Sequence, residues 1–208
     1  MTSLRLTDAR VEAAVKAVKR DEFLSSDQRL FHADDRPIAI GHGQTTSQPS
    51  LIAWMVQALQ LRPGAKVLEV GTGCGYQTAL LAELGADVYS VEIVAPLAAR
   101  AARTLERLGY AARVHLRVGD GYQGWLEAAP FDGIIVSAGA QRVPRPLLDQ
   151  LAPGGRMIIP VGRDEDMHLR LYQRDAAGDL SFETALAVRF VPLTGPLADA
   201  DRRPLRAG

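Results

Sequence analysis

The sequence predicts a doubly wound α/β fold with a mostly parallel sheet of seven strands. From Lys66 onward, short aliphatic and β-branched runs alternate with stretches of helical apolar spacing, and a glycine cluster directly follows the first run. This alternation is typical of parallel βαβ units, whose right-handed crossovers cover both faces of a sheet with helices. Two later runs flank a polar turn at Asp175–Asp179, which predicts an antiparallel hairpin that completes the sheet.

Each strand of this sheet is expected at a defined run. The predicted parallel strands are Lys66–Val70, Asp87–Glu92, Val114–Val118, Asp132–Ser137 and Arg156–Val161, and the hairpin strands are His168–Gln173 and Thr184–Phe190. Helices are predicted between the strands because apolar residues recur there at helical spacing. These residues are Leu80, Leu81 and Leu84, then Leu97, Ala101, Leu105 and Leu108, and later Leu147, Leu148 and Leu151.

The first part of the chain carries two further predicted helices and a long loop. The first helix is capped by Thr7 or Asp8 and has an apolar face of Val11, Ala14, Val15 and Val18. The second begins near Pro49, ends before Pro63-Gly64 and has an apolar face of Ile52, Met55, Val56 and Leu59. Residues Asp34–Pro49 show little periodicity and read as a loop, and loops of this length are often functional.

We expect these elements to form one domain. The chain has 208 residues, of which 47% are hydrophobic, as in an ordinary globular unit. Within it we expect N-terminal helices and a substrate loop at 1–62, a ligand-binding core at 63–162, the last strands at 163–198 and a polar tail at 199–208.

Composition narrows the class of partner. Lysine and arginine together number 24 and so do aspartate and glutamate, which leaves no uniform field for nucleic acid or an anionic membrane. Cys74 is the only cysteine, which excludes an internal disulfide and a multi-cysteine zinc cluster, and the scattered histidines predict no metal site. The first twenty residues contain no uninterrupted hydrophobic stretch, so we expect no secretory signal or membrane span. These features predict a cytoplasmic protein, which we expect to be a monomer.

The glycine cluster predicts a ligand at the carboxyl edge of the sheet. Gly71, Gly73 and Gly75 let the backbone turn sharply and approach a ligand, although such a cluster can also mark only a tight strand-to-helix connection. Their spacing, G-x-G-x-G, differs from the G-x-G-x-x-G of dinucleotide folds, and Glu69 before the turn would repel a pyrophosphate. A carboxylate there suits a ligand with an amino group and a sulfonium centre, as in S-adenosylmethionine.

Two more acidic residues follow predicted strand ends. Glu92 can accept hydrogen bonds from both ribose hydroxyls, with a solvated strand-end acid as the alternative. Asp120, between Gly119 and Gly121, can accept from an exocyclic amine such as that of adenine, with a plain turn as the alternative. Three acidic strand ends in order predict one ligand, S-adenosylmethionine, lying across the carboxyl edge.

Several segments resemble the protein-L-isoaspartate O-methyltransferases, a family with the Rossmann-like fold of class I S-adenosylmethionine-dependent methyltransferases. The most specific segment is Ile-Gly-His-Gly-Gln-Thr-Thr-Ser-Gln-Pro at Ile40–Pro49, which looks like the family's loop ahead of the cofactor core. Further similar segments are Val67–Tyr76, Val118–Gly121, Ala129–Asp132, Gln150–Arg156 and Phe190–Leu193. The departures are Cys74, where serine is more usual, and Ser137-Ala138-Gly139-Ala140, which varies a Thr-Ala-Ala-Ala-like stretch.

The resemblance implies transfer of a methyl group from S-adenosylmethionine to the free carboxylate of L-isoaspartyl residues in damaged proteins and peptides, with S-adenosylhomocysteine as product. It nominates Ser47 as catalytic, while the alternative role of Ser47 is to cap the helix that begins near Pro49. The implied substrate contacts are Thr45, Thr46, Ser47, Val191, Pro192 and Leu193. The implied cofactor contacts are Glu69, Gly71, Thr72, Gly73, Gly75, Glu92, Ile93, Leu97, Asp120 and Gly121.

Three other functions remain open at the level of sequence. The chain could methylate a different small-molecule or protein acceptor, because an altered substrate loop can keep the same cofactor core. It could be a binding module that keeps affinity for S-adenosylmethionine without turnover, against which Ser47 and the three acidic residues argue. A nicotinamide-dependent oxidoreductase is the weakest alternative because of the glycine spacing and Glu69.

Overall fold

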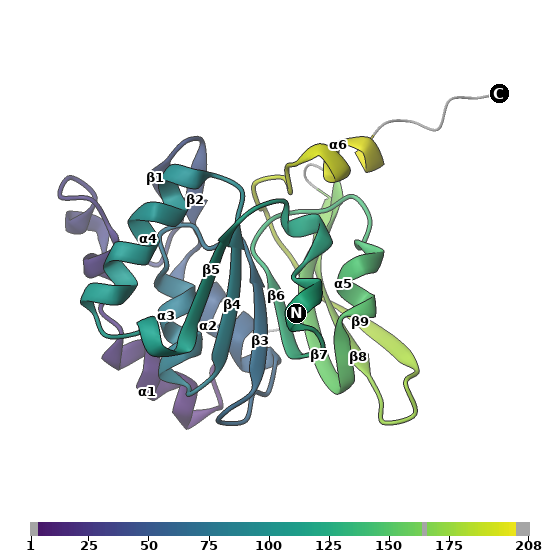
Figure 1. Cartoon of the computed structure of the whole chain (residues 1–208). Coiled ribbons are helices and arrows are strands. Elements are labelled where there is room, and N and C mark those ends of the chain that lie inside the picture. Colours follow the sequence, from purple (N-terminus) through teal and green to yellow (C-terminus); the bar gives the residue numbers. More distant parts are fainter. Residues whose placement is uncertain (1–3, 164–165, 203–208) are drawn as a thin grey trace.

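A computed structural model describes residues 4–163 and 166–202 of the chain (Figure 1). Its centre is a seven-stranded sheet in the order β5-β4-β3-β6-β7-β8-β9. The strands are β3 (Lys66–Val70), β4 (Asp87–Glu92), β5 (Val114–Val118), β6 (Phe131–Val136), β7 (Leu151–Arg163), β8 (Asp166–Arg174) and β9 (Leu180–Ala187). The strands β3 to β7 pair in parallel, whereas β8 pairs antiparallel with both β7 and β9. The predicted doubly wound, mostly parallel sheet of seven strands is confirmed.

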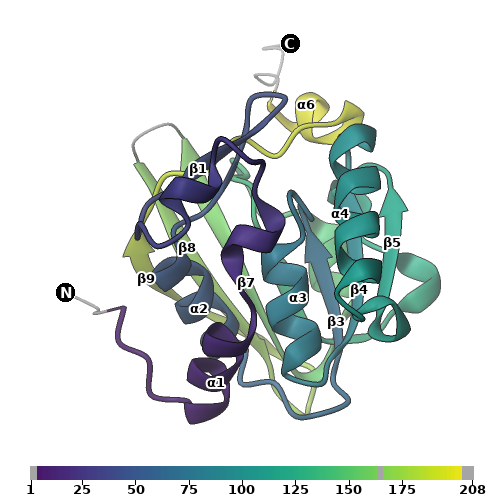
Figure 2. The ribbon, with the colours of Figure 1, turned by 90° about the vertical axis from the view of Figure 1, so that its left-hand side faces the viewer.

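Helices cover both faces of the sheet. The helices α1 (Ala9–Ala17), α2 (Pro49–Ala58), α3 (Tyr76–Glu83) and α4 (Ala95–Arg107) lie over one face (Figure 2), and α5 (Arg145–Asp149) lies over the other. Side chains of β3 alternate between the two faces, so Val67 joins the core beneath α1 to α4 while Leu68 joins the core beneath α5. Burial on both faces explains why the central strands read as continuous apolar runs.

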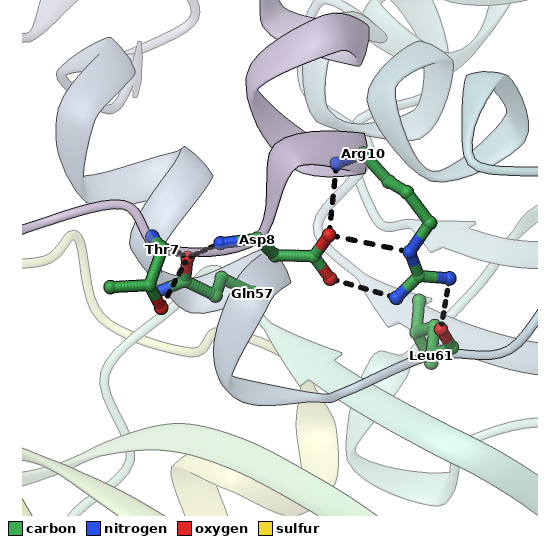
Figure 3. Close-up of polar contacts among 5 residues, drawn as sticks. All are labelled: Thr7, Asp8, Arg10, Gln57 and Leu61. Carbon is green, nitrogen blue, oxygen red and sulfur yellow. Dashed lines mark hydrogen bonds and ion pairs between the residues drawn. The ribbon is translucent and has the colours of Figure 1, made fainter.

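The N-terminal helix is fastened to the second helix by polar contacts (Figure 3). Asp8 is the cap of α1 and accepts a hydrogen bond from the Arg10 N–H at 2.9 Å, so the cap is Asp8 rather than Thr7. The N–H groups of Thr7 and Asp8 both donate to the side-chain oxygen of Gln57 on α2, at 2.6 and 2.8 Å. Arg10 also donates to the backbone oxygen of Leu61, at 2.9 Å. These contacts hold α1 against the end of α2.

The predicted loop Asp34–Pro49 contains a small hairpin, so this part of the prediction was wrong. The strands β1 (Ile38–Gly41) and β2 (Gln44–Thr46) pair antiparallel around the turn Gly41-His42-Gly43. Ile38 and Ile40 are buried while their neighbours are exposed, which is the period of two that a strand requires. All three turn residues have positive φ, of 93°, 54° and 70°, a conformation that glycine adopts without strain.

The bounds of four strands differ from the prediction. The strand β8 begins two residues earlier and ends one residue later than predicted. The strand β6 begins and ends one residue early. The strand β7 begins at Leu151, which helical spacing had placed on the preceding helix, and β9 lies earlier than the predicted Thr184–Phe190. Beyond β9 the backbone N–H of Val188 donates to Met167, after which the chain leaves the sheet. The start of the predicted tail is helical, because α6 spans Pro196–Arg202, and 203–208 fall outside the described residues.

No helix within 4–163 and 166–202 is both long and apolar enough to cross a membrane.

Candidate active site

The carboxyl ends of β3, β4 and β6 border a cavity of about 560 Å³, a volume that includes its opening to solvent. The adjacent strands β3 and β6 are followed by α3 and α5, which lie on opposite faces of the sheet. This arrangement opens a crevice between the two connections, where α/β folds bind small ligands. The cavity is lined by Ile40, Gln44, Thr45, Val70, Gly71, Gly73, Val91, Glu92, Ile93, Gly121, Ser137, Ala138, Val191, Pro192, Leu193 and Thr194.

The three glycines after β3 serve two purposes. Gly71 and Gly73 line the cavity and have φ values of 94° and 58°, so they turn the chain sharply at the cavity wall. Gly75 faces the other way, where an added Cβ would lie 3.3 Å from side-chain atoms of Ala101 and Leu105 on α4. The turn therefore combines close approach to a ligand with close packing of two helices.

Glu92 presents a fixed carboxylate to the cavity. Its Oε2 accepts a hydrogen bond from the Gly73 N–H at 2.8 Å, and its Oε1 accepts from the Val94 N–H at 2.9 Å. The residue is buried, and each oxygen keeps a second lone pair for a ligand hydroxyl. Beside it Ile93 is 38% exposed and forms an apolar part of the wall.

Glu69 does not line the cavity, which corrects the expectation that its carboxylate faces the ligand. It is completely buried and accepts hydrogen bonds from Gln77 Nε2 at 2.9 Å, Thr78 Oγ1 at 2.5 Å and Ser90 Oγ at 2.6 Å. Burial raises the pKa of Glu69 to about 7, the three hydrogen bonds oppose that rise, and the nearby charge of Glu92 adds to it. Glu69 therefore braces the glycine turn from inside the protein.

Four other predicted contacts lie around the cavity without lining it. Thr72 is buried, with its hydroxyl 2.5 Å from Ser90 Oγ, and Leu97 is part of the core. Gly75 packs on α4, as described above. Asp120 accepts from the Tyr122 N–H at 2.9 Å and from the Leu197 N–H at 3.3 Å, so its carboxylate caps a turn and holds the start of α6. The alternative interpretation of Asp120 as a turn residue matches this geometry.

Gly121, by contrast, lines the cavity. A Cβ added there would clash with Val70 Cγ1, so glycine allows this turn to pack directly against β3.

A second hollow, a groove of about 1250 Å³ including its opening to solvent, adjoins the first cavity. Thr45, Ser137 and Val191 line both spaces, so the two meet at these residues. The groove is lined by Leu4, Pro37, Thr45, Ser47, Gln48, Leu51, Ser137, Leu186, Ala187, Val188, Arg189, Phe190 and Val191. Of the predicted substrate contacts, Pro192 and Leu193 line the first cavity instead, and Thr46 is buried and lines neither.

Ser47 lines the groove and does not cap α2. The cap position is Gln48, and the N–H and hydroxyl of Ser50 both bind the carboxylate of Asp35, at 2.9 and 2.7 Å. The capping role that sequence offered as an alternative for Ser47 is therefore filled by Asp35 from across the loop.

Arg20 fastens the loop that carries Ser47. Only 5% exposed, it donates to four backbone carbonyls, those of His32 at 3.4 Å, Asp34 at 2.9 Å, Arg36 at 3.0 Å and Ser47 at 3.2 Å. A planar guanidinium can bridge several carbonyls at once, which an ammonium group cannot do equally well. Burial lowers the pKa of Arg20 because the charged guanidinium is removed from water. The four carbonyl oxygens take the place of that water and hold the side chain in position.

Sequence reasoning missed Arg20, Asp35, Gln77 and Ser137 as site residues. Ser137 follows β6 at the carboxyl edge of the sheet, and this position could have identified it in the way that it identified Glu92. Arg20, Asp35 and Gln77 act through contacts that depend on tertiary structure, and no local pattern marks them.

The sequence is similar to a defined family of enzymes along most of its length. Over 3–198 it matches the family described as Protein-L-isoaspartate(D-aspartate) O-methyltransferase (PCMT). The Protein-L-isoaspartate O-methyltransferase of Gloeobacter violaceus is 53% identical over 185 residues, which is 88% of this chain and 89% of that protein. The protein of the same name from Anaeromyxobacter dehalogenans is 56% identical over 191 residues, which is 91% of each chain.

Solved structures agree with this similarity. A protein-L-isoaspartate O-methyltransferase structure has a TM-score of 0.82 and 32% identity and covers 91% of this chain, which spans 62% of that longer chain. A Plasmodium falciparum protein of the same description, solved in complex with S-adenosyl-L-homocysteine, has a TM-score of 0.79 and 25% identity, covering 91% of this chain and 92% of its own. The chain therefore belongs to the protein-L-isoaspartate(D-aspartate) O-methyltransferase family.

Proposed function

We propose that this enzyme transfers a methyl group from S-adenosylmethionine to the free carboxylate of L-isoaspartyl residues in damaged proteins and peptides. One observation carries the proposal beyond family membership: a cavity with a fixed carboxylate meets a groove lined by a serine, and three residues form their common wall. The cavity suits a small cofactor, and the groove suits an extended peptide. Methyl esterification at the junction starts the repair, because the ester then forms a succinimide that partly returns to aspartate.

The residues that line the cavity fit S-adenosylmethionine. When bound, this cofactor supplies a methyl group on a sulfonium centre. Glu92 would accept hydrogen bonds from the ribose hydroxyls, with its own position fixed by two backbone N–H groups. Gly71, Gly73 and Gly121 would allow close approach of the backbone, and Ile93 would pack against an apolar part of the cofactor. We assign Glu69, Thr72, Gly75, Leu97 and Asp120 to the support of these contacts.

The groove supplies the substrate contacts. Ser47 would hold one oxygen of the isoaspartyl carboxylate so that the other oxygen lies in line with the methyl group. In the reaction an O–CH₃ bond forms, the S–CH₃ bond breaks, and the sulfur leaves as a neutral thioether. A carboxylate is ionised at neutral pH, so no proton has to be removed from the nucleophile. Positioning by Ser47, Thr45 and Val191 is then the main contribution of the chain, with Thr46, Pro192 and Leu193 as supporting wall residues.

The wall of the groove also bears on which peptides the enzyme accepts as substrates. Val191 forms part of a segment whose backbone is tied to Gly139, with the Gly139 N–H donating to Val191 at 2.8 Å and the Leu193 N–H donating to Gly139 at 2.8 Å. A substrate wall held in this way can contact a peptide through main-chain groups, which tolerates many neighbouring side chains. A methyltransferase with a different acceptor is the remaining alternative.

We further propose that the chain acts as a single domain, as a monomer and in the cytoplasm. Both hollows are walled by residues of this one chain, which supports a monomer that needs no partner to complete its site. Cys74 is buried, and burial raises the pKa of its thiol, so the thiol stays protonated and packs in the core. A reduced, buried cysteine is consistent with the proposed cytoplasmic location.

A repair assay tests the proposed function. A synthetic isoaspartyl peptide is incubated with enzyme and S-adenosylmethionine, and the isomers are separated by chromatography over time. The proposal predicts growth of the aspartyl isomer at the expense of the isoaspartyl isomer, only in the presence of cofactor. Cofactor binding without conversion would instead favour a different acceptor or a binding module.

A further inference from the structure

Ser137 stands where the cavity and the groove meet. It directly follows β6, its backbone N–H donates to Val70 at 2.8 Å, and a Cβ added to Gly71 would lie 3.4 Å from its own Cβ. It lines both spaces, as do Thr45 and Val191, so a group that passes from cofactor to substrate passes beside it. Of the residues on this shared wall, Ser137 is the one whose hydroxyl is tied to a buried polar network.

The network fixes which way the Ser137 hydroxyl donates. Gln77 Nε2 lies 2.9 Å from Glu69 Oε1 and 2.9 Å from Ser137 Oγ. Glu69 Oε2 already accepts hydrogen bonds from the hydroxyls of Thr78 and Ser90, and Glu69 Oε1 accepts from Gln77 Nε2, so the amide NH₂ of Gln77 faces the carboxyl group. The second N–H of the same NH₂ group then donates to Ser137 Oγ, which acts as the acceptor. The proton of Ser137 is therefore directed away from Gln77.

We infer that Ser137 donates a hydrogen bond to the isoaspartyl carboxylate, beside Ser47, and that Gln77 and Glu69 are its positioning residues. This inference rests on the proposed function. The substrate is favoured over the carboxylate of the cofactor because Ser137 also lines the groove, whereas Glu92, Gly71 and Gly73 line only the cavity. Glu69 thereby influences the reaction although it is completely buried.

The chemistry predicts which kinetic constant depends on Ser137. The carboxylate carries its full charge before the reaction and becomes a neutral ester as the O–CH₃ bond forms and the S–CH₃ bond breaks. A donor to this carboxylate binds the substrate at least as strongly as the transition state, so its loss weakens binding more than turnover. The hydrogen bond would also be weaker to the ester, which favours release of the product.

The test uses the full-length enzyme with Ser137→Ala and, as a matched control that keeps the hydroxyl, Ser137→Thr. We expect Ser137→Ala to raise KM for an isoaspartyl peptide about tenfold, as for the loss of a hydrogen bond to a charged group, with a smaller change in kcat. Calorimetric affinity for S-adenosylhomocysteine should stay within about twofold of the parent enzyme, since that affinity does not depend on the substrate contact. Ser137→Thr, which keeps the donor, should restore most of the peptide affinity that Ser137→Ala loses.

Two outcomes would overturn the inference. An unchanged KM in Ser137→Ala would remove the proposed contact, and a loss of S-adenosylhomocysteine affinity with unchanged peptide KM would make Ser137 a cofactor ligand. Failure of the proposed function is distinguishable from both, because the parent enzyme would then leave the isoaspartyl peptide unmethylated while it still binds S-adenosylhomocysteine.

The positioning role of Gln77 is tested by a double-variant cycle. Gln77→Leu alone should raise peptide KM, because Ser137 loses the donor that fixes its orientation. In the Ser137→Ala background the same change should add less than about twofold, because residues of one network are not additive. Full additivity of the two KM effects would contradict a role for Gln77 through Ser137 and leave it with a structural role only.

Discussion

At the scale of single residues, Glu69 has the most unusual environment of the described acidic groups. Its carboxylate is fully buried and is surrounded by the side chains of Gln77, Thr78 and Ser90, which all donate to it. These donors hold it in place, but burial still raises its pKa from an ordinary value of 4.5 to about 7. Stability therefore depends on the protonation state of one side chain that the solvent cannot reach.

This shift predicts how stability changes with pH. The folded pKa of Glu69 lies above the unfolded pKa, so its favourable contribution is complete below about pH 4.5 and is lost as pH rises through about 7. Across that window the free energy of unfolding should fall by about 3 kcal/mol on account of this residue. Urea unfolding at several pH values measures it. The Glu69→Gln variant should lack this component, and an identical pH profile in both proteins would contradict the assignment.

Glu92 predicts a separate effect on cofactor affinity. Glu92→Gln removes the charge and one acceptor that face the cavity, so affinity for S-adenosylhomocysteine should fall by about tenfold or more. Isothermal titration calorimetry measures this change. Glu106→Gln is the matched control, because it removes the same charge from an exposed position on α4. Equal affinity in the Glu92→Gln variant and the control would remove Glu92 from the cofactor site.

Ser47 predicts an effect on catalytic efficiency rather than on cofactor binding. Because Asp35 already fills the capping role at α2, Ser47→Ala should leave thermal stability nearly unchanged. It should lower kcat/KM for an isoaspartyl peptide about tenfold or more, since the hydroxyl both binds and orients the attacking carboxylate. Steady-state kinetics and a melting curve measure the two quantities. A variant that loses stability but keeps its kcat/KM would show that the serine is structural.

At the scale of elements, the loop that precedes α2 is held in place by Arg20. This residue connects four carbonyls across the loop and thereby fixes the backbone of Ser47. The hairpin β1–β2 then brings Ile40, Gln44 and Thr45 to the wall of the cavity. One loop thus contributes to both hollows, and its conformation depends on a side chain from the preceding part of the chain.

Arg20→Lys should loosen this loop. The lysine keeps the charge but cannot bridge the four carbonyls, so we expect a loss of about 2 kcal/mol in stability, in line with unsatisfied buried groups. We also expect a higher KM for the peptide and a lower kcat, measured in one set of steady-state assays. Arg29→Lys, at an exposed position of the same segment, is the control and should change neither. Equal behaviour of the two variants would contradict the anchoring role.

Elements differ in how far sequence could predict them. The strands β3, β4 and β5 match their predicted bounds. The first two are mostly buried, as their apolar residues indicate, whereas β5 is an edge strand in which apolar and polar residues alternate. The hairpin β1–β2 was missed because its two strands are short, with four and three residues. Its turn also contains a non-glycine residue with positive φ, His42, which no simple turn rule predicts. The start of β7 was missed because Leu151 continues a helical spacing that ends at Asp149.

At the scale of the whole molecule, the sheet gathers residues that are far apart in the sequence at one carboxyl edge. Glu92 and the glycines were predictable as site residues because the order of strands and turns already places them there. The burial of Glu69, and its link through Gln77 to Ser137, was not, because it depends on how α3 packs against β3 and β6. Sequence therefore indicated residues that line the cavity better than it indicated the network beneath them.

The central claim is that the junction of cavity and groove methylates an isoaspartyl carboxylate. The most direct measurement is methyl transfer from labelled S-adenosylmethionine to one peptide made in two forms, with L-isoaspartate or L-aspartate at the same position. The account predicts label in the isoaspartyl peptide and none above background in the aspartyl peptide. Equal labelling of the two peptides, or labelling of neither by an enzyme that binds the cofactor, would contradict it.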